Sequence, residues 1–499
     1  MNMNILYKIG DYFKESLEEK LLRKEYKKAE TAKDEEKMKD SLRKLKKLKG
    51  ITSKQTTVEN KDGSVRTETI MCFSTNVFVQ YLLTVFKVVK LQDAVAFYNW
   101  KEHHYEFLDS EIYLRFFKMV LDELDVGVWN MSREKEYLKR FQRDIRRQLK
   151  EWQVPKGIVC FTNGILDIVN HVFTPGDNPQ VINFACTGYA YDPDAKCENW
   201  LKFLLDVFNG DSQQIKVLQQ CMGYSFCYSM SYLHIIVILL GKGRNGKSIV
   251  GTVLTHLHGV RNCSASSLAS ISSRFGTAAV FDKVINVSAE EQVEVDTAVL
   301  KAISGADLIQ VERKFEKPFF VRTYIKLWLL SNDLRFTDRS RGWEERLVPL
   351  TFENVYVDKP KPGTCERKRD YKLLERLLQE IPGIFNWCYE GLKDLENADW
   401  KLAESQKVAQ AREMIMQEAN PVLLFANQRI ATVPNNSEKK ADVYRTFKAW
   451  ASTNSIDVGN FVSAQKFYPE FESILRDRKI SPKTKRIQGN QCYADIQII

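Results

Sequence analysis

The chain has 499 residues, which is longer than one hydrophobic core usually supports, so we expect about three domains. Its 44% hydrophobic and 28% charged residues are typical of a globular protein and exclude a predominantly disordered one. The net charge of +10 favours a polyanionic partner, although proteins without such a partner also reach this value.

The cysteine pattern and the longest apolar run indicate the cellular compartment and argue against structural zinc. Ten cysteines are scattered from Cys72 to Cys492 without a C-x-x-C pair or a cluster with histidine, so neither structural zinc nor a disulfide framework is expected. The apolar run from Leu233 to Leu240 is too short to cross a bilayer, and "MNMNILYKIGDYFKESL" lacks a signal-peptide core. We therefore expect a cytoplasmic protein without a membrane partner.

The N-terminal part is expected to contain a charged helical region and a helical domain. Residues 1–50 hold 15 Lys/Arg and 10 Asp/Glu, and their apolar residues recur at loosely helical spacing. A solvated helical hairpin within residues 1–60 is favoured over a dedicated nucleic-acid arm. A polar hairpin or linker follows, with Asp62-Gly63 as its turn, and residues 61–154 are otherwise predicted to be mainly helical.

Residues 155–228 are predicted to form a largely helical domain before the nucleotide-binding core. Short strands are expected from Cys160 to Tyr191, with a turn at Pro175-Gly176-Asp177. The stretch from 199 to 226 has the pattern of two helices, broken at Asn209-Gly210. The core is then expected to span residues 229–402.

A glycine-rich turn follows the apolar, β-branched run from Ile235 to Leu240. It matches G-x-x-x-x-G-K-[ST] in full and consists of Gly241, Lys242, Gly243, Arg244, Asn245, Gly246, Lys247 and Ser248. Such glycines let backbone N–H groups surround phosphate oxygens, and the helix that follows directs its positive end at the same anion. Lys247 is expected to reach the β- and γ-phosphates, and Ser248 to bind Mg²⁺. The alternative is a chance match on an ordinary strand–helix turn.

Polar residues at the ends of later apolar strands indicate the chemistry of this site. "KVINVSAEEQV" ends in Glu290 and Glu291, of which one carboxylate can hold Mg²⁺ through water and the other can accept the proton of the attacking water. "IKLWLLSNDLRF" leads to Asn332, which can orient that water or sense the γ-phosphate. Acidic pairs after apolar strands are common, so this pattern alone does not decide the chemistry.

Two basic segments are candidates for contacts outside the subunit. "DRSRGWEERLVPLTF" carries Arg339, Arg341 and Arg346, and an arginine donated across a subunit boundary stabilises a transferring phosphoryl group. In "SGADLIQVERKFEKPFFVRTY", two strand-like pieces flank a tip with several cations and an aromatic residue, which suits nucleic-acid binding. Ordinary surface charges and an ordinary mixed-charge hairpin tip are the alternatives.

Taken in order, these segments resemble the superfamily 3 helicases, and most closely the phage, plasmid and poxvirus-type primase-helicases. "GKGRNGKS" is similar to that family's form of the phosphate loop, and "LLSND" with "DRSRGWEERLVPLTF" is similar to its sensor and arginine-finger region. "EIPGIFNWCYEGLKDL" resembles its closing helix, and "FTNGILDI" resembles its upstream domain. The likeness covers residues 155 to 400, about half of the chain.

This resemblance implies an AAA+-like homo-hexameric ring that uses ATP and Mg²⁺ to move along single-stranded or forked DNA in a bacterial host or a virus-infected cell. By motif, Lys247 and Ser248 would bind phosphate and metal, Glu290 and Glu291 would serve metal and water, and Asn332 would be the sensor. Arg346 would be the finger, with Arg341 as second choice, because Glu345 stands where relatives often carry a basic residue. The DNA contacts of the hairpin would be Arg313, Lys314 and Lys317.

Many relatives carry a primase domain before the helicase, whereas only about 150 residues precede the shared region here. Asp109-Ser110-Glu111 is the nearest match to a paired-carboxylate motif, but its context favours a helix N-terminus. We therefore expect a separate primase or polymerase as a partner.

The tail is expected to begin with a linker, residues 403–435, that includes part of the polar joint "ATVPNNSEKKA". Residues 436–499 show the order helix, helix, turn and hairpin, which is that of a winged-helix domain. A basic run there suits contacts with duplex phosphates, and an origin is one candidate duplex; a structural or oligomer-stabilising domain is the alternative. The run consists of Arg476, Arg478, Lys479, Lys483, Lys485 and Arg486.

The predicted fold class is an α/β P-loop, AAA+-like motor core with a mainly helical N-terminal region and a small α+β, winged-helix-like C-terminal domain. The predicted function is an ATP-dependent DNA helicase that acts when a mobile element or virus begins replication. One alternative is an origin-binding initiator whose ATPase is only an assembly switch, and another is a metabolic P-loop kinase.

Overall fold

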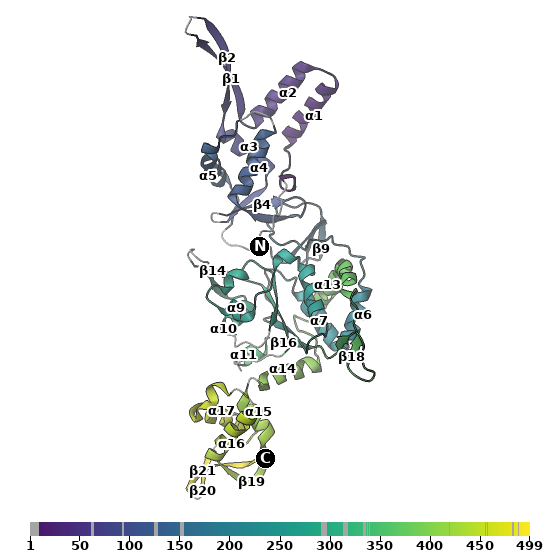
Figure 1. Ribbon diagram of the computed structural model, residues 1–499, viewed down its shortest axis with the longest axis vertical. Helices are drawn as coiled ribbons and strands as arrows, with labels where there is room; N and C mark the ends of the chain where they lie inside the picture. Colours follow the sequence, from purple (N-terminus) through teal and green to yellow (C-terminus); the bar gives the residue numbers. More distant parts are fainter. Residues whose placement is uncertain are drawn as a thin grey trace. The chain divides into compact units, whose positions relative to one another are not determined.

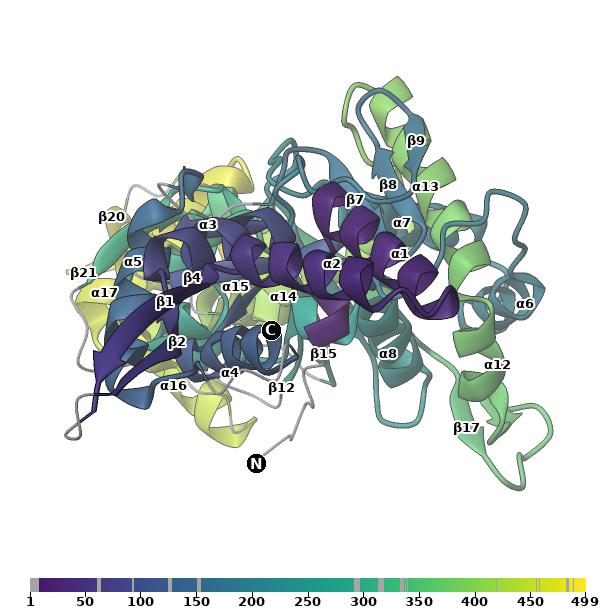
Figure 2. The same ribbon diagram turned by 90° about the horizontal axis from the view of Figure 1, so that it is seen from above.

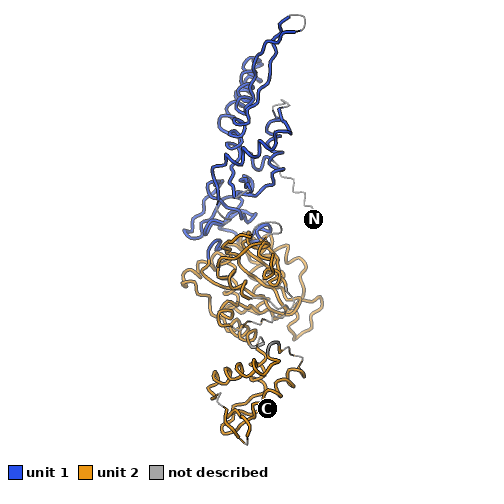
Figure 3. Tube along the Cα trace, turned by 90° about the vertical axis from the view of Figure 1, so that its left-hand side faces the viewer, with its two compact units in different colours: residues 1–195, 226–230, 256–262 blue, residues 196–225, 231–255, 263–499 orange. Residues whose placement is uncertain are grey.

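The computed structural model, drawn as a ribbon in Figure 1, divides the chain into two compact units, which Figure 3 shows in different colours. Unit 1 comprises residues 1–195, 226–230 and 256–262, and unit 2 comprises residues 196–225, 231–255 and 263–499. The structure describes residues 9–60, 64–91, 94–123, 128–149, 154–290, 297–312, 318–332, 336, 338, 340–418, 420–454, 456, 458–481, 484–487 and 489–499. No helix within these ranges is long and apolar enough to cross a membrane.

Unit 1 begins with the predicted helical hairpin, formed by α1 (Leu17–Thr31) and α2 (Glu35–Leu48). Each helix begins at a capping side chain, because Ser16 accepts a hydrogen bond from the backbone N–H of Glu19 and Asp34 from that of Lys37. Behind them, Lys49 is 0% exposed and donates to the carboxylate of Glu123 at 2.9 Å. This pair joins the buried Lys49 to the partly exposed Glu123 and links the charged helices to the rest of the unit.

The next part of unit 1 begins with a long β-hairpin. Strands β1 (Ile51–Glu59) and β2 (Val65–Phe73) pair antiparallel, which confirms a hairpin over a linker. The predicted turn at Asp62-Gly63 lies outside the described residues.

The prediction that residues 61–154 are mainly helical is wrong. Helices α3 (Thr75–Val85), α4 (Ser110–Asp122) and α5 (Glu134–Asp144) alternate with strands β3 (Val88–Leu91), β4 (Ala94–Asn99), β5 (His104–Leu108) and β6 (Gln148–Leu149). The strands form one sheet in the order β5-β4-β3-β6. Phe97 on β4 lies in one core with helical residues such as Phe117. Asp109 is the N-cap of α4, as its context predicted.

The strands and helices expected in residues 155–228 are present. Strands β7 (Ile158–Phe161), β8 (Gly164–Asp167) and β9 (Val172–Pro175) form an antiparallel sheet in unit 1. Helices α6 (Glu198–Val207) and α7 (Ser212–Tyr224) belong to unit 2 and are separated at Asn209-Gly210, where both residues have positive φ. Asp211 then caps α7 by accepting from two backbone N–H groups.

The core of unit 2 is a five-stranded parallel sheet in the order β11-β12-β15-β10-β16. Its strands are β10 (Ile236–Leu240), β11 (Cys263–Ser264), β12 (Ile285–Glu290), β15 (Lys326–Ser331) and β16 (Leu347–Thr351). Because the strands are parallel, their carboxyl ends share one edge, where ligands of such sheets bind. The apolar runs of the sequence predicted these central strands.

Helices and short sheets surround this core: α8 (Lys247–His258), α9 (Leu268–Ser272), α10 (Thr297–Ser304), α11 (Arg341–Glu344), α12 (Leu373–Gln379), α13 (Ile381–Asn397), the antiparallel pair β13 (Leu308–Val311) and β14 (Phe319–Arg322), and the parallel pair β17 (Val355–Val357) and β18 (Glu366–Lys368). Helices α7 and α13 lie side by side in both ribbon views (Figures 1 and 2). A Cβ on Gly223 would lie 2.3 Å from the carbonyl oxygen of Cys388, so this close approach requires glycine.

The C-terminal part contains the predicted pair of helices and the hairpin. They are α16 (Lys440–Thr453), α17 (Ala464–Asp477), β20 (Thr484–Ile487) and β21 (Asn490–Ile498). The expected linker, residues 403–435, is instead occupied by α14 (Gln406–Glu418), α15 (Pro421–Arg429) and the start of β19 (Ile430–Lys439). Its apolar residues Val422 and Phe425 are buried against Phe447, and β19 pairs with β21.

Candidate nucleotide-binding site

The glycine-rich turn connects β10 to α8 at the carboxyl edge of the parallel sheet. Two positions of the turn require glycine. Gly246 has a φ of +93°, and a Cβ on Gly241 would lie 2.3 Å from the carbonyl oxygen of Phe352. The buried Asn245 donates to that same carbonyl oxygen at 3.3 Å. The turn is therefore held against the segment that follows β16.

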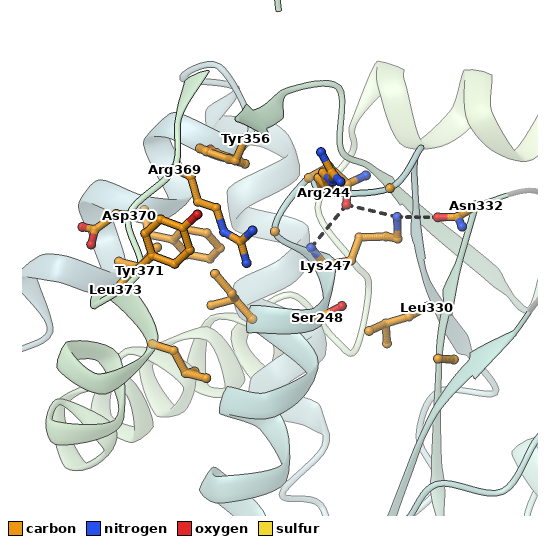
Figure 4. Close-up of a pocket in the computed structure, with 17 residues that line it drawn as sticks. Arg244, Lys247, Ser248, Leu330, Asn332, Tyr356, Arg369, Asp370, Tyr371 and Leu373 are labelled. Atoms are coloured by element: carbon orange, nitrogen blue, oxygen red, sulfur yellow. Dashed lines mark hydrogen bonds between the residues drawn. The ribbon is translucent and has the colours of Figure 1, made fainter. Parts of the chain in front are cut away.

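Lys247, the first residue of α8, lies beneath this turn with only 6% of its surface exposed. Its Nζ donates to the side-chain oxygen of Asn245 at 3.0 Å and, as Figure 4 shows, to that of Asn332 at 3.1 Å. It also donates to the carbonyl oxygens of Lys242 at 3.3 Å and of Gly241. Burial lowers the pKa of Lys247 to about 8. Within the described part of the chain, the acceptors of this ammonium group are therefore four neutral oxygen atoms.

The structure thus brings Lys247 and Asn332 together although 85 positions separate them in sequence. They meet because β10 and β15 are neighbouring parallel strands, paired with Leu240 opposite Ser331. Glu290 ends the next strand, also opposite Ser331, so its backbone lies at the same edge. The side chain of Glu290 and all of Glu291 lie outside the described residues, and their metal and water roles stay predictions.

Residues 243–248 of the turn and Asn332 line a pocket of about 720 Å³, which lies within unit 2. This volume is within the usual range for a small-molecule site. Besides the turn, Ser248 and Asn332, the pocket has a second group of lining residues that the sequence did not predict. They are Phe203, Tyr356, Arg369, Asp370, Tyr371, Leu373 and Leu374. No motif marks them, because they come from α6, from β17 and the segment after β18, and from the start of α12, which only the fold brings to the turn.

The two described arginine-finger candidates differ in their surroundings, and neither lines the pocket. Arg346 is held within its own chain, with Nε donating to the Ser304 hydroxyl at 3.2 Å and Nη1 to the Gly342 carbonyl oxygen. The Arg341 side chain is 88% exposed and pairs only with Glu345, one turn along, among the ion pairs of the described residues. Arg339 lies outside the described residues.

The predicted DNA contacts are only partly described. Arg313, Lys314 and Lys317 at the hairpin tip, and Lys483 in the tail, lie outside the described residues. Lys485 and Arg486 are exposed on β20, and Lys479 follows α17 in a left-handed conformation. Arg478 instead joins α17 to α15, because its guanidinium donates to Asn427 at 2.6 Å and to the carbonyl oxygen of Ile430 at 3.1 Å.

Known proteins resemble this chain in sequence. Residues 83–209 match the family described as "D5 N terminal like", and residues 239–346 match a family of unknown function, DUF5906. Over 267 residues the chain is 24% identical to "Putative helicase L207/L206" of Acanthamoeba polyphaga mimivirus. That alignment covers 49% of this chain and 25% of the relative, so the chain spans about a quarter of the relative's length.

Solved structures also resemble it. The A form of the apo C-terminal region of NrS-1 matches 84% of this chain and 98% of its own, with a TM-score of 0.48 and 13% identity. A second apo structure of that region matches 85% of this chain and 100% of its own, with a TM-score of 0.45 and 12% identity. The sequence alignment thus relates the chain to one viral protein named as a putative helicase. Its membership of superfamily 3 stays a prediction.

Proposed function

We propose that the chain is an ATP-dependent DNA helicase of superfamily 3 that works as an AAA+-like hexameric ring in viral or mobile-element replication. The observation that carries the proposal is the bond between Lys247 and Asn332 at the edge of the parallel sheet. It brings a cation that can bind phosphate beside a polar strand-end residue that can position water, and these are two of the groups that nucleotide hydrolysis uses. The similarity to a viral protein named as a helicase supports DNA as the substrate.

Phosphate oxygens of bound ATP would replace the protein oxygens that now accept hydrogen bonds from the Lys247 ammonium group. The ammonium group now donates to two amide oxygens and two carbonyl oxygens, which are weaker partners than a phosphate dianion. The positive end of α8, which begins at Lys247, would favour the same anionic ligand. Asn332, once released by Lys247, can orient the attacking water toward the γ-phosphate.

The donor set also fits Mg²⁺. Ser248 lines the pocket directly after Lys247, and the backbone of Glu290 lies at the same sheet edge. A hydroxyl and a carboxylate are oxygen ligands of the kind that Mg²⁺ prefers. Bound there, Mg²⁺ would neutralise charge on the phosphate oxygens. Glu291 would then accept the proton of the attacking water.

The exposed Arg341 is better placed than Arg346 to reach a neighbouring subunit, because Arg346 is bonded within its own chain. We therefore propose Arg341 as the finger and Arg346 as the residue that holds its turn. Translocation would use the cationic tip of the β13–β14 hairpin, and Lys485 and Arg486 of the tail would contact duplex phosphates. A separate primase would supply primers.

Strand displacement on a forked DNA substrate tests the proposal. The intact chain should unwind the fork with ATP and Mg²⁺ but not without ATP, and single-stranded DNA should stimulate its ATP hydrolysis. Lys247→Ala should abolish both activities, whereas Lys401→Ala, which removes an exposed lysine that does not line the pocket, should not. Since Lys247 is buried, a thermal melt of each variant must show that it is folded.

Two other outcomes would contradict the proposal. ATP-dependent assembly on duplex DNA without strand displacement would indicate an initiator whose ATPase is an assembly switch. ATP hydrolysis that DNA does not stimulate, but a small phosphate acceptor does, would indicate a kinase.

A further inference from the structure

The pocket has two ends of different chemistry. One end, made by the glycine-rich turn with Lys247, Ser248 and Asn332, is polar and suited to phosphate. The other end contributes aromatic, cationic and aliphatic side chains that the phosphate chemistry does not use. In Figure 4, Arg369 and Tyr371 lie on one side of Lys247, and Asn332 lies on the opposite side.

Tyr371 is a large aromatic residue that remains 70% exposed, yet its ring is held in place. Its hydroxyl donates to Asp358 at 2.8 Å, and the guanidinium carbon of Arg369 lies 4.6 Å from the ring centroid. Burial in a core does not explain this ring, because most of its surface remains accessible. An ordered, accessible aromatic residue at a pocket is a surface on which a flat ligand can stack.

Backbone hydrogen bonds connect this wall to the phosphate end. The N–H of Tyr356 on β17 donates to the carbonyl oxygen of Arg244 in the turn at 2.7 Å. The N–H of Arg369, directly after β18, donates to the carbonyl oxygen of Val357 at 2.9 Å, and β17 pairs with β18. The position of Arg369 and Tyr371 is therefore set relative to the phosphate-binding turn.

We propose that Arg369 and Tyr371 form the nucleobase-binding wall of this pocket, so that a purine base stacks there while the phosphates bind at Lys247. The inference rests on the proposed ATP site and adds the base subsite to it. Stacking on an aromatic ring and on a guanidinium plane contributes to nucleotide affinity. Leu373 and Leu374, at the start of α12, add apolar surface to the same end of the pocket.

The alternative role for Arg369 is a contact with the triphosphate. Inorganic tripolyphosphate separates the two roles, because it carries the phosphates without a base. If Arg369 binds the base, its loss weakens ATP binding and leaves tripolyphosphate binding unchanged. If Arg369 binds phosphate, its loss weakens both ligands.

The experiment measures the affinity of the full chain for Mg-ATP and for Mg-tripolyphosphate by calorimetry. Tyr371→Ala should raise the Kd for ATP by about tenfold, within the roughly 5- to 150-fold range of stacking contacts, and should change the Kd for tripolyphosphate less than about twofold. Tyr371→Phe is the matched control, because it keeps the ring and loses only the hydroxyl; its Kd for ATP should stay within about threefold of the wild type. Arg369→Ala should change the two Kd values in the same way as Tyr371→Ala, with a weaker affinity for ATP and an almost unchanged affinity for tripolyphosphate.

Unchanged ATP affinity in Tyr371→Ala would overturn the inference, as would an equal loss for both ligands. If Tyr371→Ala does not fold in a thermal melt, Tyr371→Leu replaces it, since leucine keeps apolar bulk but offers no ring. Failure of the wild-type chain to bind either ligand would instead refute the ATP site itself. The base-binding wall and the ATP site itself are therefore refuted by different results.

Discussion

Replacing Arg341 tests whether the nucleotide site is shared between subunits, which is the feature that requires a ring. Its side chain is 88% exposed and its ion pair with Glu345 lies at the surface, so Arg341→Ala should leave the fold and its melting temperature nearly unchanged. A finger that stabilises the transferring phosphoryl group is worth roughly 10³ to 10⁵ in rate. Arg341→Ala should therefore lose almost all ATP hydrolysis while still binding ATP.

Mixing this variant with Lys247→Ala gives the quantitative prediction. An interface is active only when its phosphate loop comes from an Arg341→Ala subunit and its finger from a Lys247→Ala subunit. In an equimolar, randomly assembled mixture each condition holds for about half of the positions, so about a quarter of the interfaces should be active. ATP hydrolysis should then reach about a quarter of the wild-type rate, with its maximum at equal proportions. Unwinding should recover less, because a ring motor needs several active interfaces in sequence.

The assay is ATP hydrolysis against mixing ratio, with subunit exchange shown independently by energy transfer between labelled subunits. No recovery at any ratio would refute the shared site. Arg346→Ala is the comparison, because it removes the bonds to Ser304 and Gly342 and should lower the melting temperature. If Arg341→Ala keeps full activity while a mixture of Arg346→Ala and Lys247→Ala recovers, Arg346 is the finger.

Three further predictions concern unit 1 and the tail. Lys49→Ala should lower the free energy of unfolding of unit 1 by about 1–3 kcal/mol in urea titrations, because it removes the buried donor to the Val120 carbonyl oxygen and to the partly exposed Glu123; an unchanged free energy of unfolding would contradict this. Burial alone would lower the pKa of His104, but hydrogen bonds and charge interactions with Cys186 and Glu106 raise this pKa to about 10. Protonated His104 should therefore stabilise the fold fully below about pH 6.5, and this stabilisation should be lost as pH rises through about 10. His104→Gln should remove this alkaline dependence of the melting temperature. Lys485→Ala with Arg486→Ala should weaken duplex binding and reduce the slope of log K against log salt by about 2, and an unchanged slope would show that these two residues do not contact DNA phosphates.

Local sequence was sufficient for the phosphate end of the site. The apolar run before Gly241 predicted a buried strand, and the spacing of Lys247 and Ser248 placed both at the start of a helix, as the structure shows. These features depend on neighbouring residues only, since a glycine-rich turn after a buried strand has few other conformations. The helical hairpin, the break at Asn209-Gly210 and the helix that begins at Asp109 were predictable for the same reason.

Tertiary structure decided what the sequence left open. The pattern of residues 61–154 predicts mainly helices, yet strands β3 to β6 lie there, because short apolar runs fit either element and their pairing partners decide between them. Arg478 was indistinguishable from its basic neighbours until its bonds to α15 and β19 were known. Arg369 and Tyr371 reach the pocket only because β18 returns beside β17, whose backbone is bonded to the phosphate-binding turn. Residue type and spacing determined which groups can bind phosphate, whereas strand pairing between distant segments determined what lies beside them.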